Sequence, residues 1–153
     1  MANTYCQIYI HAIFAVKYRD AMITPSFESK LHGVIGGLIN QTGCKTYIVN
    51  GVENHVHCFF SLKPTVSISN LMQTVKSQSS RFVNENNLAN GRFEWQDGYG
   101  AFSYNHSQRH NVWEYINNQK AHHHRTAFID EYLGFLSDFE IPYERRYVYH
   151  DLI

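Results

Sequence analysis

The sequence predicts an α+β fold in which an antiparallel sheet lies under helices. Three observations carry this prediction: segments with alternating apolar residues, two segments with helical apolar spacing between them, and Gly or Pro at the boundaries. In chain order these segments form a β-α-β-β-α-β series, the split βαβ arrangement called ferredoxin-like. Its helices cover one face of the sheet, and two C-terminal helices follow this core.

The first strand and the first helix have clear apolar patterns. Between Tyr5 and Tyr18 apolar residues recur at every second position from Cys6 to Val16, which predicts a strand with one apolar face. Thr24 and Pro25 then open a helix that Gly43 is placed to end. Its apolar residues follow i, i+3, i+4, i+7, i+8 spacing: Leu31, Val34, Ile35, Leu38 and Ile39.

Two more strands, over residues 44–50 and 54–62, are predicted to be joined by a short turn at Gly51. A second helix begins at Ser67 or Ser69, since serine is a favourable N-terminal cap. Its apolar inner face carries Ile68, Leu71, Met72, Val75, Phe82 and Val83.

The last core strand is predicted around Phe93–Trp95, and it resumes at 101–104 after a turn through Asp97–Gly100. Two additional helices follow, one over about 107–124 and one over about 126–139. The tail after them is expected to form a final strand or an arm that embraces a partner.

The length of 153 residues and the mass of 17.9 kDa match one domain over 1–153, with a core in 1–105 and the added helices in 106–153. The chain does not begin with a signal-peptide pattern, and no apolar run approaches the roughly 18 residues of a membrane span. We therefore expect a cytoplasmic protein without membrane attachment. Its 3 cysteines lack C-x-x-C spacing and are expected to be reduced.

The charge balance limits how the chain can bind nucleic acid. Lys plus Arg equals Asp plus Glu at 13 each, which argues against the broad basic surface of a sequence-indifferent binder. The 11 tyrosines, 10 phenylalanines and 10 histidines offer stacking and hydrogen bonding instead. Any binding of nucleic acid is therefore expected to be local.

Two histidines stand at alternate positions of the strand predicted over 54–62. His55 and His57 should point to one face, while Val56, Cys58 and Phe60 point into the core. Two imidazoles on one face can chelate one metal ion. The alternative is a pair of partly exposed surface histidines.

A possible third ligand lies on the helix predicted over 107–124. Tyr115 and Gln119 are four residues apart and share one helix face, and a glutamine amide oxygen can bind a metal ion. The alternative is that Tyr115 packs beside Val112 and Ile116, which periodicity alone favours.

Three motifs together resemble a known family. They are the H-hydrophobic-H strand, the run "WQDGYGAFS" from Trp95 to Ser103, and the helix "YINNQKAHH" that begins at Tyr115. In this order and spacing they resemble the single-tyrosine HUH transposases of bacterial insertion sequences, the IS-two-hundred type. The resemblance runs from "IHAIFAVKYR" at Ile10 to "FEIPYERRYV" ending at Val148.

This resemblance implies a compact dimeric enzyme that cuts and rejoins single-stranded DNA at transposon ends and recognises hairpins near them. It implies that His55 and His57 are metal ligands, that Gln119 is an additional ligand, and that Tyr115 is the nucleophile. In many members the tyrosine helix is attached flexibly and completes the site of the partner subunit. This chain matches the family pattern at all four positions.

The implied chemistry is a metal-assisted transesterification. Cleavage of a phosphodiester needs stabilisation of phosphate charge, which a divalent ion, Mg²⁺ or Mn²⁺, supplies. Attack by Tyr115 gives a 5′-phosphotyrosine, and a 3′-hydroxyl can reverse the reaction without ATP. Two alternatives stay open: a domesticated relative that binds nucleic-acid hairpins without cutting, and a metal-dependent nuclease that uses water.

Other polar residues are weaker candidates. Lys17, Arg19, Lys76 and Arg81 are candidates for contacts with the DNA backbone, although each also suits a solvated surface. His11 or His123 is a candidate base for the tyrosine proton. Consecutive residues point in different directions around a helix, so His122, His123 and His124 cannot all face one ion. We expect them to end the helix, where an imidazolium suits the negative end of the helix dipole.

Overall fold

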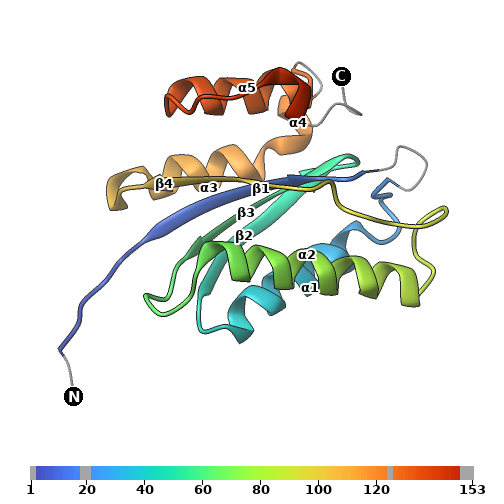
Figure 1. The fold of residues 1–153 in the computed structure, drawn as a ribbon. Coiled ribbons are helices and arrows are strands. Elements are labelled where there is room, and N and C mark those ends of the chain that lie inside the picture. Colours follow the sequence, from blue (N-terminus) through green and yellow to red (C-terminus); the bar gives the residue numbers. More distant parts are fainter. Residues whose placement is uncertain (1–2, 18–21, 124–125, 149–153) are drawn as a thin grey trace.

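The computed structural model describes residues 3–17, 22–123 and 126–148. Four antiparallel strands form one sheet in the order β2-β3-β1-β4, with β1 at Tyr9–Ala15, β2 at Lys45–Val52, β3 at His55–Ser61 and β4 at Gly100–Tyr104. Helices α1 and α2 cover one face, and α3, α4 and α5 lie over the other (Figure 1). The predicted α+β class and the β-α-β-β-α-β order are confirmed.

The face under α1 (Glu28–Gln41) and α2 (Ile68–Glu85) holds the larger hydrophobic core. Ser67 caps α2, because its hydroxyl accepts a hydrogen bond from the Asn70 backbone N–H. The alternating residues of β1 and β3 and the inner faces of both helices meet here: Ile10, Ala12, Phe14, Val56, Cys58, Phe60, Leu31, Ile35, Leu71, Met72 and Val75. Hydrophobic burial on this face fixes which side chains β3 presents to the opposite face.

The opposite face is also covered, so β1 is buried on both sides. Helix α5 (Phe128–Asp138) packs on Ile13, Ala15 and Phe102, and α3 (Arg109–Asn117) packs on Tyr9 and Phe59. Among the described residues, no helix combines the length and apolar character needed to cross a membrane.

Some predicted boundaries are wrong. Gly51 lies inside β2, and the turn to β3 is formed by Glu53 and Asn54. The strand predicted at Phe93–Trp95 is reduced to one bridge between Trp95 and Val16. The described part of the tail forms no strand and contains only a short 3-10 turn at Arg145–Tyr147.

The helix predicted over 107–124 is divided into three pieces. A 3-10 turn at His106–Gln108 precedes α3, and α4 (Gln119–His123) follows a break at Asn118. The Asn50 amide of β2 donates hydrogen bonds to the carbonyl oxygens of Ile116 and Asn117 at 2.9 and 3.2 Å. Because these contacts satisfy carbonyls at the end of α3, they stabilise the break.

Gly51 allows β2 to approach β3 closely beside His55. A Cβ at position 51 would lie 2.2 Å from the His55 carbonyl oxygen and 3.0 Å from the Val56 Cα, both backbone atoms. We expect Gly51→Ala to lower the free energy of unfolding by about 2–3 kcal/mol, since the strands must separate. Urea unfolding measures this. The control Gly33→Ala, in α1 with no atom within 4 Å of its new Cβ, should instead stabilise by about 1 kcal/mol.

Candidate metal and tyrosine site

His55 and His57 point from β3 toward the helices of the second face, and both are fully buried at 0% exposure. The alternative of a partly exposed surface pair is therefore wrong. Val56, Cys58 and Phe60 lie in the core on the other side, as the alternation predicted. The short β2–β3 turn and the paired strands hold the two imidazoles side by side, with ring centroids 5.0 Å apart.

One nitrogen of each imidazole is engaged away from the centre of the site. His55 Nδ1 lies 2.7 Å from Asn54 Oδ1, and His57 Nδ1 lies 2.7 Å from His11 Nε2. Burial lowers the pKa of His55 to about 3, despite the nearby Glu131 carboxylate, so this imidazole is neutral. Its Nδ1 carries the proton given to Asn54, because the amide oxygen only accepts. Its Nε2 therefore presents a lone pair toward α5.

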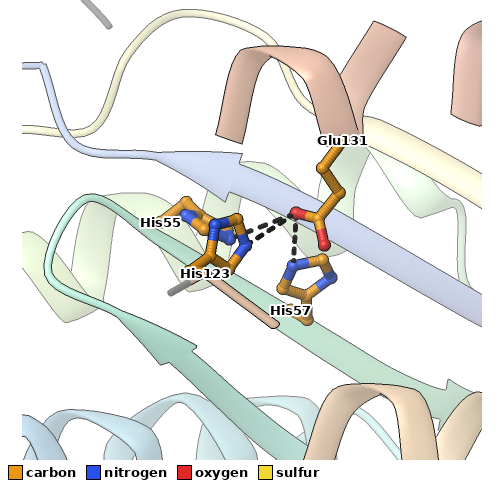
Figure 2. A group of neighbouring side chains, drawn as sticks. All are labelled: His55, His57, His123 and Glu131. Atoms are coloured by element: carbon orange, nitrogen blue, oxygen red, sulfur yellow. Dashed lines mark hydrogen bonds and ion pairs between the residues drawn. The ribbon is translucent and has the colours of Figure 1, made fainter. Parts of the chain in front are cut away.

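A carboxylate from α5 meets these nitrogens. Glu131 Oε1 lies 3.4 Å from His55 Nε2, 3.2 Å from His57 Nε2 and 3.2 Å from His123 Nε2 (Figure 2). Burial alone would raise the pKa of the Glu131 carboxyl, but the polar contacts with His123, His55 and His57 outweigh it and hold this pKa well below its usual range. We call His55, His57, His123 and Glu131 the His–Glu cluster.

Tyr115 and Gln119 contact the other oxygen of this carboxylate. The Tyr115 hydroxyl donates a hydrogen bond to Glu131 Oε2, and Gln119 Nε2 donates to the same atom at 3.1 Å. Gln119 Oε1 lies 3.3 Å from His55 Nε2. Burial, followed by the charge of Glu131, raises the pKa of Tyr115 above its ordinary value, so the phenol holds its proton here. The tyrosine and the imidazoles thus share one carboxylate.

The His–Glu cluster fits a divalent metal ion. One ligand atom from each of its four residues lies within 4.8 Å of the others. His57 Nε2 is buried without a hydrogen bond of acceptable geometry, although Glu131 is near. Imidazole nitrogens with a carboxylate are a common donor set for transition metals, and contacts such as those of His11 and Asn54 orient metal-binding imidazoles.

An open cavity of about 400 Å³ borders the Tyr115 ring between α3 and α5. His11 and His122 also line it, together with the acidic side chains Asp130, Glu131 and Asp138. A cavity of this volume can admit one nucleotide to the tyrosine. No lysine or arginine is among the residues that line it, so a phosphate there would need a bound metal ion as its cationic partner.

The match to a protein family is extensive. The family described as "Transposase IS200 like" matches residues 4–119, which is most of the chain. The chain belongs to the IS200-like transposases. A search of the curated proteins found no match for this transposase.

Solved structures with the same fold include two transposases. The chain is similar to a proposed transposase from Deinococcus radiodurans R1, with a TM-score of 0.58 and 19% sequence identity over 78% of this chain and 95% of the other. It is also similar to a REP-associated tyrosine transposase bound to a REP hairpin, with a TM-score of 0.59 and 15% identity over 80% and 73% of the two chains. At these identities the similarity shows the fold alone.

The structure of this IS200-like transposase brings together His55, His57, Tyr115 and Gln119, whose roles stay predictions. It adds Glu131, which the sequence analysis missed. The signal was a carboxylate at an inner position of an amphipathic helix, because Glu131 is only 7% exposed and shares that face with Phe128, Ile129, Tyr132 and Leu136. A charged residue is rarely placed there without partners.

The histidine run at the end of the tyrosine helix was interpreted incompletely. His122 and His123 do occupy the last turn of α4. However, His123 also reaches Glu131 Oε1 at 3.2 Å, and His122 Nε2 lies 3.4 Å from Oε2. His124 lies outside the described residues.

Lys17, Lys76 and Arg81, which were predicted to contact the DNA backbone, have partners within the chain, and their role in DNA binding stays a prediction. Lys17 and Arg81 each form an ion pair with a glutamate, at 3.6 and 2.7 Å. Lys76 Nζ donates hydrogen bonds to two backbone carbonyls of residues 96–98 at 2.7 and 2.6 Å. Lys76 and Arg81 belong to α2, on the sheet face opposite the cluster (Figure 1). Arg19 lies outside the described residues.

The neutral buried histidines predict a pH-dependent stability in the presence of a chelator. The folded pKa of His55 is about 3 and its ordinary value is 6.5, so the unfolded chain binds the extra proton between these values. Stability is then complete above pH 6.5 and falls below it by about 1.4 kcal/mol per pH unit for this group. Burial also lowers the pKa of His11, which adds to the loss. Urea unfolding at pH 7.5, 6.5 and 5.5 measures it, and equal stability at all three values would contradict it.

Proposed function

We propose that this transposase cuts and rejoins single-stranded DNA through the Tyr115 hydroxyl, with a divalent metal ion bound beside it. One observation carries the proposal: Tyr115 and the imidazoles of His55 and His57 converge on the same buried carboxylate, Glu131. A packing role for Tyr115 does not require its hydroxyl to meet charged and metal-binding groups. The cavity that borders its ring gives a substrate access to it.

The proposed reaction exchanges one phosphoester for another. A bond forms between the Tyr115 oxygen and phosphorus, and the bond between phosphorus and the 3′ oxygen breaks. The phenol loses its proton as this bond forms, and the released 3′ oxygen gains one, so one proton passes overall from the phenol to the 3′ oxygen. A 3′-hydroxyl from another strand reverses these changes and joins the strands, so neither water nor ATP is consumed.

The proposed metal ligands are His55, His57 and Gln119, and His123 and Glu131 lie within reach of the same position. When bound, a divalent ion supplies Lewis-acid stabilisation of charge on the scissile phosphate. The imidazole-rich donor set suits Mn²⁺ better than Mg²⁺. His11 and Asn54 orient the two imidazoles for binding.

The proposed substrate is single-stranded DNA with hairpins at the ends of a transposon. The family, and the relative whose structure holds a REP hairpin, support this choice. We also propose a homodimer. The described chain holds Tyr115 beside its own imidazoles, so one subunit contains every proposed group, and a dimer with exchanged tyrosine helices would build the same site in trans.

The test uses end-labelled single-stranded DNA from the flanking locus, with Mn²⁺ or with EDTA. A labelled band at the mass of the protein on a denaturing gel, present only with metal, is the expected result. Cleavage without such a band would indicate a nuclease that uses water. Retention on a native gel without cleavage would indicate a binding module, and either outcome would overturn the proposal.

A further inference from the structure

A second hollow lies beside α3, on the side away from Tyr115. It has a volume of about 260 Å³ and is lined by Tyr9, Tyr47, Phe59, Arg109, His110 and Trp113. We call it the aromatic hollow. Tyr9 and Phe59 are buried in its floor, whereas Trp113 is 36% exposed on α3. Large aromatic side chains left partly exposed around a hollow are typical of binding sites.

The rings of the aromatic hollow are arranged as a platform. Tyr9 stacks on Phe59 with centroids 5.9 Å apart, and Tyr47 lies 5.6 Å from Phe59. The Tyr9 hydroxyl is fixed by a 2.7 Å hydrogen bond to His106 Nδ1. Since these rings are held by the sheet and by the start of the tyrosine helix, they need little ordering to receive a flat ligand.

The cations Arg109 and Lys45 lie at the aromatic hollow. Arg109 lines it, and Lys45 Nζ lies 5.4 Å from the centroid of the Tyr47 ring. Glu114 lies near its edge, since its Oε1 is 3.9 Å from Nε2 of His110. No carboxylate is among the residues that line it, in contrast to the cavity at Tyr115, which three acidic side chains border. The aromatic hollow therefore suits an anionic ligand with a planar group, and its volume is below the roughly 300–1,000 Å³ of sites that enclose larger ligands.

We propose that the aromatic hollow binds one unpaired base of the single-stranded DNA substrate, stacked on Trp113, while Arg109 contacts its phosphate. This inference rests on the proposed function and extends it from the reacting phosphate to a flanking nucleotide. Base stacking on aromatic side chains is the usual basis of single-strand binding, and it compensates for a net charge of zero.

The position of the bound base follows from the helix. Trp113 and Tyr115 are two residues apart, so their side chains project about 200° apart on α3. A strand that reaches both must cross a helix about 10–12 Å wide, and stacked nucleotides rise about 3.4 Å each. The bound base therefore lies about three nucleotides from the scissile phosphate.

The test measures coupling between Trp113 and individual bases. Oligonucleotides with an abasic analogue at each position in turn are titrated against the full chain by fluorescence anisotropy, in a Tyr115→Phe background that prevents cleavage. At one position near the scissile phosphate, loss of the base should weaken binding about 10-fold. The same loss should have no further effect in Trp113→Leu, which already lacks the stacking partner.

Two further variants make the result specific. Tyr147→Leu removes a ring that is 74% exposed outside the aromatic hollow. It should leave unchanged the effect that each abasic position has on DNA affinity. Arg109→Gln should reduce the slope of log affinity against log salt by about 0.7, as expected for one lost phosphate contact on a single strand. Thermal unfolding checks that each variant is folded.

The outcomes separate this inference from the proposed function. If single-stranded DNA binds but the removal of each base weakens binding equally in the proteins with and without Trp113, the aromatic hollow does not hold a base. If wild-type protein and the Tyr115→Phe background bind no single-stranded DNA, the proposed function fails with it.

Discussion

Tyr115→Phe is expected to abolish the covalent protein–DNA band and to lower strand cleavage at least about 10³-fold, since it removes the attacking atom. The remaining ring still packs between His57 and Phe135, with centroids 6.0 and 5.8 Å from its own. The fold and the binding of DNA should therefore be kept. The measurement is a denaturing gel with end-labelled DNA and Mn²⁺, together with anisotropy for binding.

Tyr104→Phe is the matched control, because Tyr104 lines the same cavity. Burial, followed by the charge of Asp138, raises the pKa of Tyr104 to about 12, and its hydroxyl does not contact Glu131 in any described interaction. We expect this variant to form the covalent band. A band that persists in Tyr115→Phe and disappears in Tyr104→Phe would show that Tyr104 is the nucleophile and would contradict the role proposed for Tyr115.

The order of the core elements could be predicted because it depends on local periodicity. Alternation placed His55 and His57 on one face of a strand, and helical spacing found the apolar faces of α1 and α2. Boundaries that depend on distant contacts were wrong. The break between α3 and α4 is an example, because the Asn50 side chain that caps α3 comes from a strand 66 residues earlier.

The site could be predicted only in part for the same reason. The spacing of four residues predicted that Tyr115 and Gln119 share one helix face. The family resemblance implied that both belong to one site with His55 and His57. Glu131 belongs to a different helix, and nothing in its local sequence shows that α5 packs over β3. Its burial among three imidazoles is a consequence of tertiary packing, which periodicity does not report.

Glu131→Ala should have the largest effect on the site itself. The carboxylate is the shared partner of three imidazoles, the Tyr115 hydroxyl and the Gln119 amide. Its removal leaves these buried groups without their partner, so we expect the free energy of unfolding in EDTA to fall by about 3 kcal/mol. Asp130→Ala, one residue earlier and exposed, is the control and should change stability by less than about 0.5 kcal/mol.

Glu131→Gln separates the carboxylate's charge from its packing. The amide has the same shape and can still accept the Tyr115 hydrogen bond, so stability should stay closer to that of the wild type than in Glu131→Ala. If Glu131 is a metal ligand, loss of the charge should weaken Mn²⁺ binding at least about 10-fold, as measured by calorimetry on the protein without DNA. Equal Mn²⁺ affinity in the two proteins would restrict Glu131 to holding the tyrosine, and the metal would then depend on the histidines and Gln119 alone.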